Sequence, residues 1–117
     1  MEIGASNIGN IVVLHPNGRI DGSTSAEFQT KLLEVVAEAA DGVIIDFAKV
    51  DYISSAGLRA LMTAIRQRKD RRLAVAMLQP VIQEIFTIAR FQHVVAIFGS
   101  VNQAVEAWST PPPAGAA

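Results

Sequence analysis

Apolar residues recur at helical spacing in three long segments of the chain, residues 24–40, 55–69 and 80–89. In each segment apolar side chains follow the i, i+3, i+4, i+7 pattern, which places them along one face of an α-helix. A shorter segment after Ser100 has the same spacing. The pattern therefore predicts four helices, each with one face toward a core. The residues expected on those faces are Phe28, Leu32, Val35, Val36, Ala39, Leu58, Leu61, Met62, Ile65, Val81, Ile82, Ile85, Phe86, Ala89, Val101, Ala104, Val105 and Trp108.

Short apolar runs alternate with these helices. They cover residues 43–47 (VIIDF), 73–78 and 93–98, and they lack strict apolar–polar alternation. Such runs are typical of strands buried on both faces of a parallel sheet. Residues 11–21 read as two extended pieces, and residues 2–9 indicate a short edge strand before them. The order of elements predicts an α/β fold, a single domain with a mixed, mostly parallel sheet of about five strands flanked by four helices.

Turn and cap residues mark the ends of these elements. Residues 16–18 (Pro-Asn-Gly) are a strong turn signal between the two extended pieces. Thr24, with Glu27 three residues later, predicts a capping box at the start of the first helix. Residues 41–42 (Asp-Gly) predict the turn that ends this helix, and Pro80 is expected in the first turn of the third.

Size and composition limit the classes of function. A chain of 117 residues is expected to form one domain, and the absence of cysteine excludes disulfides and thiolate metal sites. The formal charge of -1 disfavours direct nucleic-acid binding. No apolar run approaches the ~20 residues of a spanning helix, and no signal peptide is recognisable. We expect a cytoplasmic protein with a domain over residues 1–108 and a disordered Pro/Ala-rich tail over residues 109–117.

Positive charges crowd together near the end of the second predicted helix. We expect a solvated helix end there, where cations also favour the helix dipole, rather than a contact with an acidic partner. The residues are Arg66, Arg68, Lys69, Arg71 and Arg72.

The stretch DYISSAGLRAL, residues 51–61, places two hydroxyls at a predicted helix start. The simplest interpretation is a cap: Ser54 or Ser55 accepts a hydrogen bond from a free N–H, which is worth about 1 kcal/mol. A cap explains only one serine. It also leaves open why Gly57, a poor helix residue, follows so soon. Gly57 allows close packing against a neighbour, or it clears space beside the hydroxyl for an approaching partner.

A catalytic serine fits the sequence less well. The hydrolase nucleophile elbow has the pattern G-x-S-x-G, whereas Ile53 stands two residues before Ser55. Neither His15 nor His93 can be placed as a base beside the serines, and both read as surface or strand-end residues. The chain also lacks a phosphate-binding GxxxxGK[ST] loop and the zinc motif HExxH. An enzyme is therefore not expected.

A regulatory serine would also suit this position at a helix start. Phosphorylation adds about two negative charges, which the free N–H groups and dipole of a helix start tolerate. A partner pressed against that surface would meet a hydrated dianion instead. Asp21, in the upstream stretch GRIDG (residues 18–22), lies near Ser54 and Ser55 only if their strands are neighbours, and the sequence leaves that open.

The run YISSAGLRAL, with VIIDF before it and NGRIDGSTSAEF upstream, resembles the STAS domain of stand-alone bacterial anti-sigma factor antagonists over residues 11–108. The resemblance implies that the unphosphorylated protein binds a serine kinase that is also an anti-sigma factor and so displaces a sigma factor. Phosphorylation then dissociates the complex, and a metal-dependent serine phosphatase removes the phosphoryl group. The resemblance assigns the phosphoacceptor to Ser55, and the aspartate that the family's pattern places after the upstream strand falls on Asp21. It implies no cofactor for this chain.

The chain departs from the common Asp-Ser-Ser-Gly form of this junction, because Ser54 replaces the acid and Ala56 replaces the second serine. Ser54 is thus a second candidate acceptor. Two alternatives remain: a non-phosphorylated STAS subunit of a lipid or anion transport complex, and a small enzyme or nucleotide binder of similar topology. The residues expected at the partner surface are Asp21, Ser54, Ser55, Ala56, Gly57 and Arg59.

Overall fold

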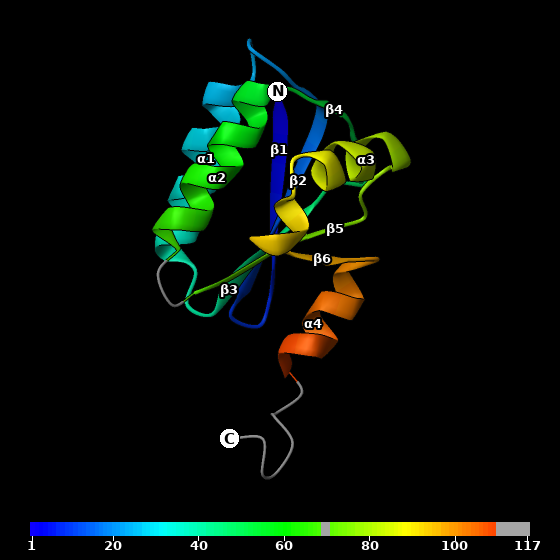
Figure 1. Ribbon diagram of the computed structural model, residues 1–117. Coiled ribbons are helices and arrows are strands. Elements are labelled where there is room, and N and C mark those ends of the chain that lie inside the picture. The colour runs from blue at the N-terminus through cyan, green and yellow to red at the C-terminus, as the bar shows by residue number, and fades with distance from the viewer. Residues whose placement is uncertain (69–70, 110–117) are drawn as a thin grey trace.

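The computed structural model describes residues 1–68 and 71–109, which form an α/β domain built on a six-stranded mixed sheet. The strand order is β1-β2-β3-β5-β6, and β4 pairs with the far end of β2 (Figure 1). Every pairing is parallel except β1 with β2, so the predicted fold class is confirmed. The strands are β1 (Glu2–Ile8), β2 (Ile11–Ile20), β3 (Gly42–Asp46), β4 (Val50–Ile53), β5 (Arg72–Ala76) and β6 (Ala96–Phe98).

Strand β2 is the longest strand of the sheet, and it ends directly before Asp21. It runs without a break through Pro16, Asn17 and Gly18, so the predicted turn at these residues is wrong. The hairpin turn instead lies at residues 9–10, between β1 and β2. Pairing of β2 with β3 ends at Leu14, so the missing N–H of Pro16 interrupts no hydrogen bond to β3. Gly18, at φ +107°, marks the register shift where β2 turns to pair with β4.

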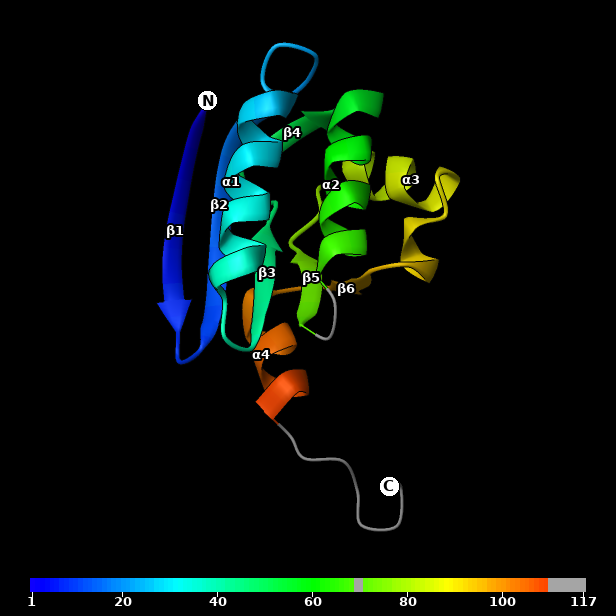
Figure 2. The same ribbon diagram turned by 90° about the vertical axis from the view of Figure 1, so that its left-hand side faces the viewer.

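Helices cover the two faces of the sheet unequally. Helices α1 (Ser25–Glu38) and α2 (Ser55–Gln67) lie side by side over one face, as Figure 2 shows. Their apolar faces join β2, β3 and β5 in the larger core cluster. Helix α4 (Val101–Ser109) packs on the opposite face, against Ile11, Val13 and Ile44. Helix α3 (Pro80–Ile88) packs near β4 at the end of the sheet, with Phe86 edge-on to Phe47.

Half of the eighteen predicted core residues are buried and seven more are partly buried, but Val81 and Ala89 are exposed. Phe28, Leu32, Ile82 and Phe86 are fully buried, whereas Val81 is 49% exposed. Ala89, just after α3, is also exposed. The predicted strand over residues 93–98 is shorter than expected: Phe91–His93 form a 3₁₀ turn, and β6 begins only at Ala96.

Two predicted caps have different roles in the structure. Thr24 is the N-cap residue of α1 but makes no side-chain cap bond, and Glu27 binds the N-terminal ammonium of Met1 at 3.0 Å instead. The predicted capping box is therefore wrong. Gly42 does not follow the helix as a cap but begins β3, where a Cβ would lie 2.8 Å from the Arg72 carbonyl oxygen. This glycine therefore serves close packing between strands.

Candidate functional site

The parallel pairing of β2 with β4 brings the two candidate stretches together. Ile20 lies opposite Ile53, and the Ser54 N–H donates a 2.8 Å hydrogen bond to the Ile20 carbonyl oxygen. Both strands end at this edge, so Asp21 and Ser54 leave adjacent strand ends. The condition that the sequence left open is therefore met. Strand β4 itself, only four residues long, was missed from the sequence because VDYI has no extended apolar run.

Ser54 is the N-cap of α2. Its backbone is extended, at φ -90° and ψ 174°, and its Oγ accepts a 3.2 Å hydrogen bond from the Gly57 N–H. Serine and aspartate are about equally good N-caps. The replacement of the family's acid by Ser54 therefore keeps the cap, although it removes a negative charge from the helix start.

Ser55 has a different environment one residue later. It is the first residue of α2, and its side chain is exposed. Within the described part of the chain, no hydrogen bond is found for its hydroxyl. The two neighbouring serines therefore divide the roles: the hydroxyl of Ser54 closes the helix, and the hydroxyl of Ser55 faces solvent above the free N–H groups of the first turn.

Gly57 packs inward, beneath the two serines. It is buried, and a Cβ at this position would lie 2.7 Å from both Ile20 Cγ2 and Ile53 Cγ1. The interpretation that this glycine clears space beside the hydroxyl is therefore wrong, because the two isoleucines fill that space. The alternative, close packing against a neighbour, is confirmed.

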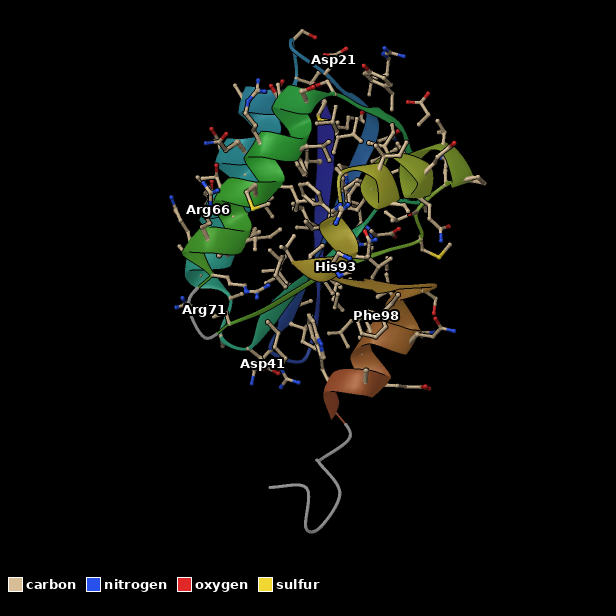
Figure 3. The ribbon with its side chains drawn as sticks, viewed as in Figure 1. Asp21, Asp41, Arg66, Arg71, His93 and Phe98 are labelled. Carbon is tan, nitrogen blue, oxygen red and sulfur yellow. The ribbon has the colours of Figure 1, made fainter. Side chains whose placement is uncertain are left out.

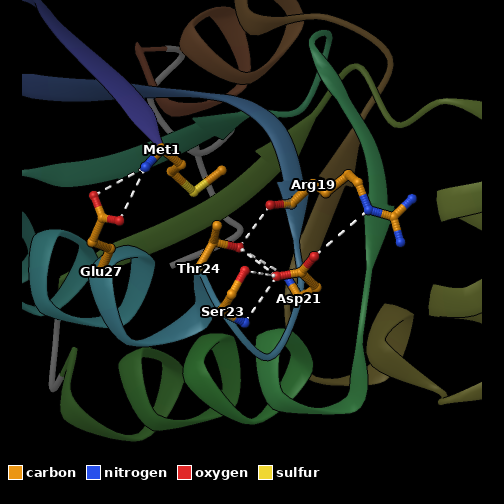
Figure 4. A network of polar contacts seen from close by, with 6 residues as sticks. All are labelled: Met1, Arg19, Asp21, Ser23, Thr24 and Glu27. Atoms are coloured by element: carbon orange, nitrogen blue, oxygen red, sulfur yellow. Dashed lines mark hydrogen bonds and ion pairs between the residues drawn. The ribbon is translucent and has the colours of Figure 1, made fainter.

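Asp21 is fixed by its own loop, as Figure 4 shows. Its Oδ1 accepts hydrogen bonds from the Ser23 hydroxyl at 2.7 Å and from the Ser23 N–H at 2.9 Å. The Thr24 hydroxyl lies 3.3 Å from the same oxygen and donates a shorter, 2.7 Å bond to the Arg19 carbonyl. The bonds from Ser23, with a smaller contribution from Thr24, hold the pKa of the Asp21 carboxyl below its ordinary value. The carboxylate is therefore ionised at neutral pH.

Two residues that the sequence did not single out complete this edge. The Arg19 guanidinium lies 4.4 Å from the centroid of the Tyr52 ring, and its Nε lies 3.6 Å from Asp21 Oδ2. Arg19 and Tyr52 are opposite each other in the β2–β4 register. Only that register could have revealed the pair, and it depends on a strand that the sequence did not show.

The remaining predicted partner residues line the outer face of α2. Arg59 is exposed and stands one turn after Ser55, so the two side chains share a helix face. Ala56 is partly buried beside them. The edge thus combines a fixed carboxylate, an exposed hydroxyl and two cations, Arg19 and Arg59, on a small surface.

The basic cluster lies around the C-terminal end of α2, and Figure 3 shows Arg66 and Arg71 away from Asp21. Arg71 Nε donates a 2.8 Å hydrogen bond to the Ala39 carbonyl, and Arg72 pairs with Asp41 at 3.1 Å. These two arginines therefore hold neighbouring elements together rather than forming only a solvated helix end. Lys69 and residues 110–117 of the predicted tail lie outside the described residues. The first residue assigned to that tail, Ser109, still belongs to α4.

Metal-binding clusters and membrane-spanning helices are not seen in residues 1–68 and 71–109. No cluster of three or more His, Cys, Asp or Glu side chains is placed to hold a metal ion. Over the same residues, every helix is too short or too polar to cross a bilayer. Neither His15 nor His93 is hydrogen-bonded to Ser54 or Ser55.

The fold is that of the STAS domain. The STAS domain family model matches residues 2–104, and the chain belongs to this family. The resemblance seen in the sequence is confirmed. Among curated proteins, the chain is similar to the proposed anti-sigma factor antagonist BtrV of Bordetella bronchiseptica. The two are 25% identical over 115 residues, which cover 97% of this chain and 99% of that protein.

Solved structures share the fold. An anti-sigma factor antagonist from Mycobacterium paratuberculosis superposes with a TM-score of 0.87 at 18% identity, covering 93% of this chain and 94% of that one. The Bacillus cell fate determinant SpoIIAA in its phosphorylated form superposes with a TM-score of 0.69 at 14% identity, covering 91% and 98%. At these identities the likeness establishes a common architecture.

Proposed function

We propose that this protein is an anti-sigma factor antagonist that switches partners by phosphorylation of Ser55. In its unphosphorylated form it binds a serine kinase that is also an anti-sigma factor. Transfer of a phosphoryl group from ATP, held by that kinase, ends the complex. A metal-dependent serine phosphatase restores the binding form, and the whole cycle takes place in the cytoplasm. The protein itself supplies no cofactor and catalyses no step of this cycle.

The observation that supports this proposal most is the division of roles between the two serines. The Ser54 hydroxyl is engaged in the helix cap, whereas Ser55 presents an exposed hydroxyl without a bond among the described residues. A kinase can reach Ser55 without opening the helix. Ser54 is only partly buried and stays the second candidate acceptor, but its modification would disturb the cap.

The expected effect of the phosphoryl group is confined to the interface. At the first position of α2 the dianion faces free N–H groups and the positive end of the helix dipole, so the fold keeps its stability. A docked partner must instead desolvate the dianion. A loss of about 3 kcal/mol of binding free energy corresponds to roughly a hundredfold weaker affinity. Asp21, ionised and held by its loop, adds a negative charge to the same edge, which also carries the cations Arg19 and Arg59.

The test uses the full chain, a serine kinase/anti-sigma factor from the same genome and ATP. Mass spectrometry should find one phosphoryl group on Ser55 in the wild type, and none on Ser55→Ala, while Ser54→Ala is still modified. Ser55→Asp should bind the kinase roughly a hundredfold more weakly than wild type. An unmodified protein, or unchanged binding by Ser55→Asp, contradicts the proposal. Co-purification with a permease that Ser55→Ala leaves intact would favour the transport-subunit alternative instead.

A further inference from the structure

A serine, a histidine and an aspartate lie in a row across β1, β2 and β3, apart from the α2 site. His15 Nε2 lies 3.0 Å from the Ser6 Oγ, and His15 Nδ1 lies 3.1 Å from Asp46 Oδ2. Ser6 is opposite Val13, which stands two residues before His15, so both side chains project from the same face of the sheet. Helix α4 packs on this face against Ile11, Val13 and Ile44, and Ser6, on the edge strand, stays exposed.

Asp46 determines which nitrogen of His15 carries the proton. Its Oδ1 accepts a 2.9 Å hydrogen bond from the Ala48 N–H, which fixes the carboxylate, and its Oδ2 faces His15 Nδ1. An ionised carboxylate only accepts hydrogen bonds, so the neutral imidazole keeps its proton on Nδ1. The lone pair of Nε2 is then directed at the Ser6 hydroxyl. This is the arrangement in which an imidazole removes a proton from a nucleophile.

The row is accessible. Ser6 is exposed on the edge strand, and the His15 side chain is 40% exposed. A cavity of about 260 Å³ adjoins His15 and Asp46, and Gly4, Lys49 and Glu2 also line it. Pockets for drug-sized ligands typically occupy about 300–1,000 Å³. The cavity is therefore too small for a large ligand, and it reaches the row at His15 and Asp46, not at Ser6.

We propose that Ser6 is a base-activated nucleophile that accepts an acyl group from an activated ester or thioester. The Ser6 Oγ forms a bond to the carbonyl carbon while its proton passes to His15 Nε2. The tetrahedral adduct then releases the alcohol or thiol, which takes that proton from His15, and Ser6 is left as an acyl ester. Asp46 acts as a positioning residue. The inference stands apart from the proposed partner switch, because no member of the row belongs to the Ser55 surface.

The experiment measures acetylation of the full chain by p-nitrophenyl acetate. We expect peptide mapping of the acid-quenched protein to place the acetyl group on Ser6, and Ser6→Ala to lack it. His15→Gln should slow nitrophenolate release by about 10²–10⁴-fold, the usual contribution of a general base. His93→Gln is the matched control, because His93 is exposed and makes no side-chain bond among the described residues; it should react like wild type. Ser55→Ala should likewise be acetylated at Ser6.

Asp46→Asn separates a positioning role from a merely structural one. It should slow the reaction and move the midpoint of the pH–rate profile, because the imidazolium formed during proton transfer loses its neighbouring carboxylate. Circular dichroism verifies that each variant is folded. Because Ser6 is exposed, Ser6→Ala should keep the fold, and it therefore tests the proposal even if Asp46→Asn unfolds. Labelling of Ser6→Ala at the wild-type level, or equal rates for His15→Gln and His93→Gln, would overturn the proposal.

Discussion

The Oγ of Ser54 accepts a hydrogen bond from the N–H of Gly57, three residues into α2, at 3.2 Å. This bond satisfies one of the free donors at the helix start. It also engages the hydroxyl of one serine and leaves the next, Ser55, exposed. The stability of the start of α2 therefore depends on Ser54, whereas the exposed hydroxyl belongs to Ser55. Single substitutions can test the two roles separately.

Ser54→Ala should lower the free energy of unfolding by about 1 kcal/mol, the usual cost of losing an N-cap side chain. Ser55→Ala is the matched control, since it removes the same hydroxyl from the exposed neighbouring position. Its effect should stay within about 0.5 kcal/mol, as for most surface substitutions. Urea unfolding of the two variants measures both values. Equal destabilisation by the two substitutions would contradict the division of roles.

A negative charge on Ser55 should leave the fold intact. At the first position of α2, a carboxylate or phosphate interacts favourably with the helix dipole, by about 0.3–1 kcal/mol at low salt. We therefore expect Ser55→Asp to melt at or slightly above the wild-type temperature. Gln67→Asp, at the last position of the same helix, is the charge-matched control and should melt lower. A lower melting temperature for Ser55→Asp would mean that phosphorylation acts by unfolding the helix.

The sequence predicted the sheet and its helices because buried strands and amphipathic helices have strong apolar patterns. The runs VIID, in β3, and LAVA, in β5, are buried through most of their length, so their apolar pattern alone predicted them. The start of α2 was equally clear from the Ser-Ser pair. The role of Ser54 as the cap could be anticipated, but not its separation from Ser55, because either serine suits the N-cap position.

The features that the sequence did not reveal depend on contacts between distant residues. The turn predicted at residues 16–18 is overridden because β4 pairs with the end of β2 and keeps the strand extended. The capping box does not form because Glu27 binds the ammonium of Met1, which is distant in sequence. The need for a glycine at position 57 likewise arises from a distant residue, because β2 places Ile20 beneath α2.

Asp21→Asn should remove a pH-dependent part of the stability. Because the pKa of this carboxyl is lower in the folded than in the unfolded protein, ionised Asp21 stabilises the fold. That contribution is fully present above the unfolded value of about 3.9 and is lost as the pH falls through the folded pKa. The wild type should therefore melt above Asp21→Asn at pH 7, and the difference should shrink on acidification below about pH 4. A difference that stays constant with pH would show that the carboxylate charge is not its source.

Gly57→Ala should destabilise the protein, although alanine is intrinsically better than glycine in a helix by about 1 kcal/mol. The new Cβ would lie 2.7 Å from Ile20 Cγ2 and from Ile53 Cγ1, and both isoleucines are buried. Overpacking of this kind typically costs about 1–3 kcal/mol, and two buried, branched side chains have little room to move, so the steric cost should exceed the helical gain. Gly22→Ala is the control, because nothing lies within 4 Å of a Cβ there. Calorimetry should find Gly57→Ala less stable and Gly22→Ala unchanged or slightly more stable; a stabilised Gly57→Ala would contradict the close approach of α2 to the sheet.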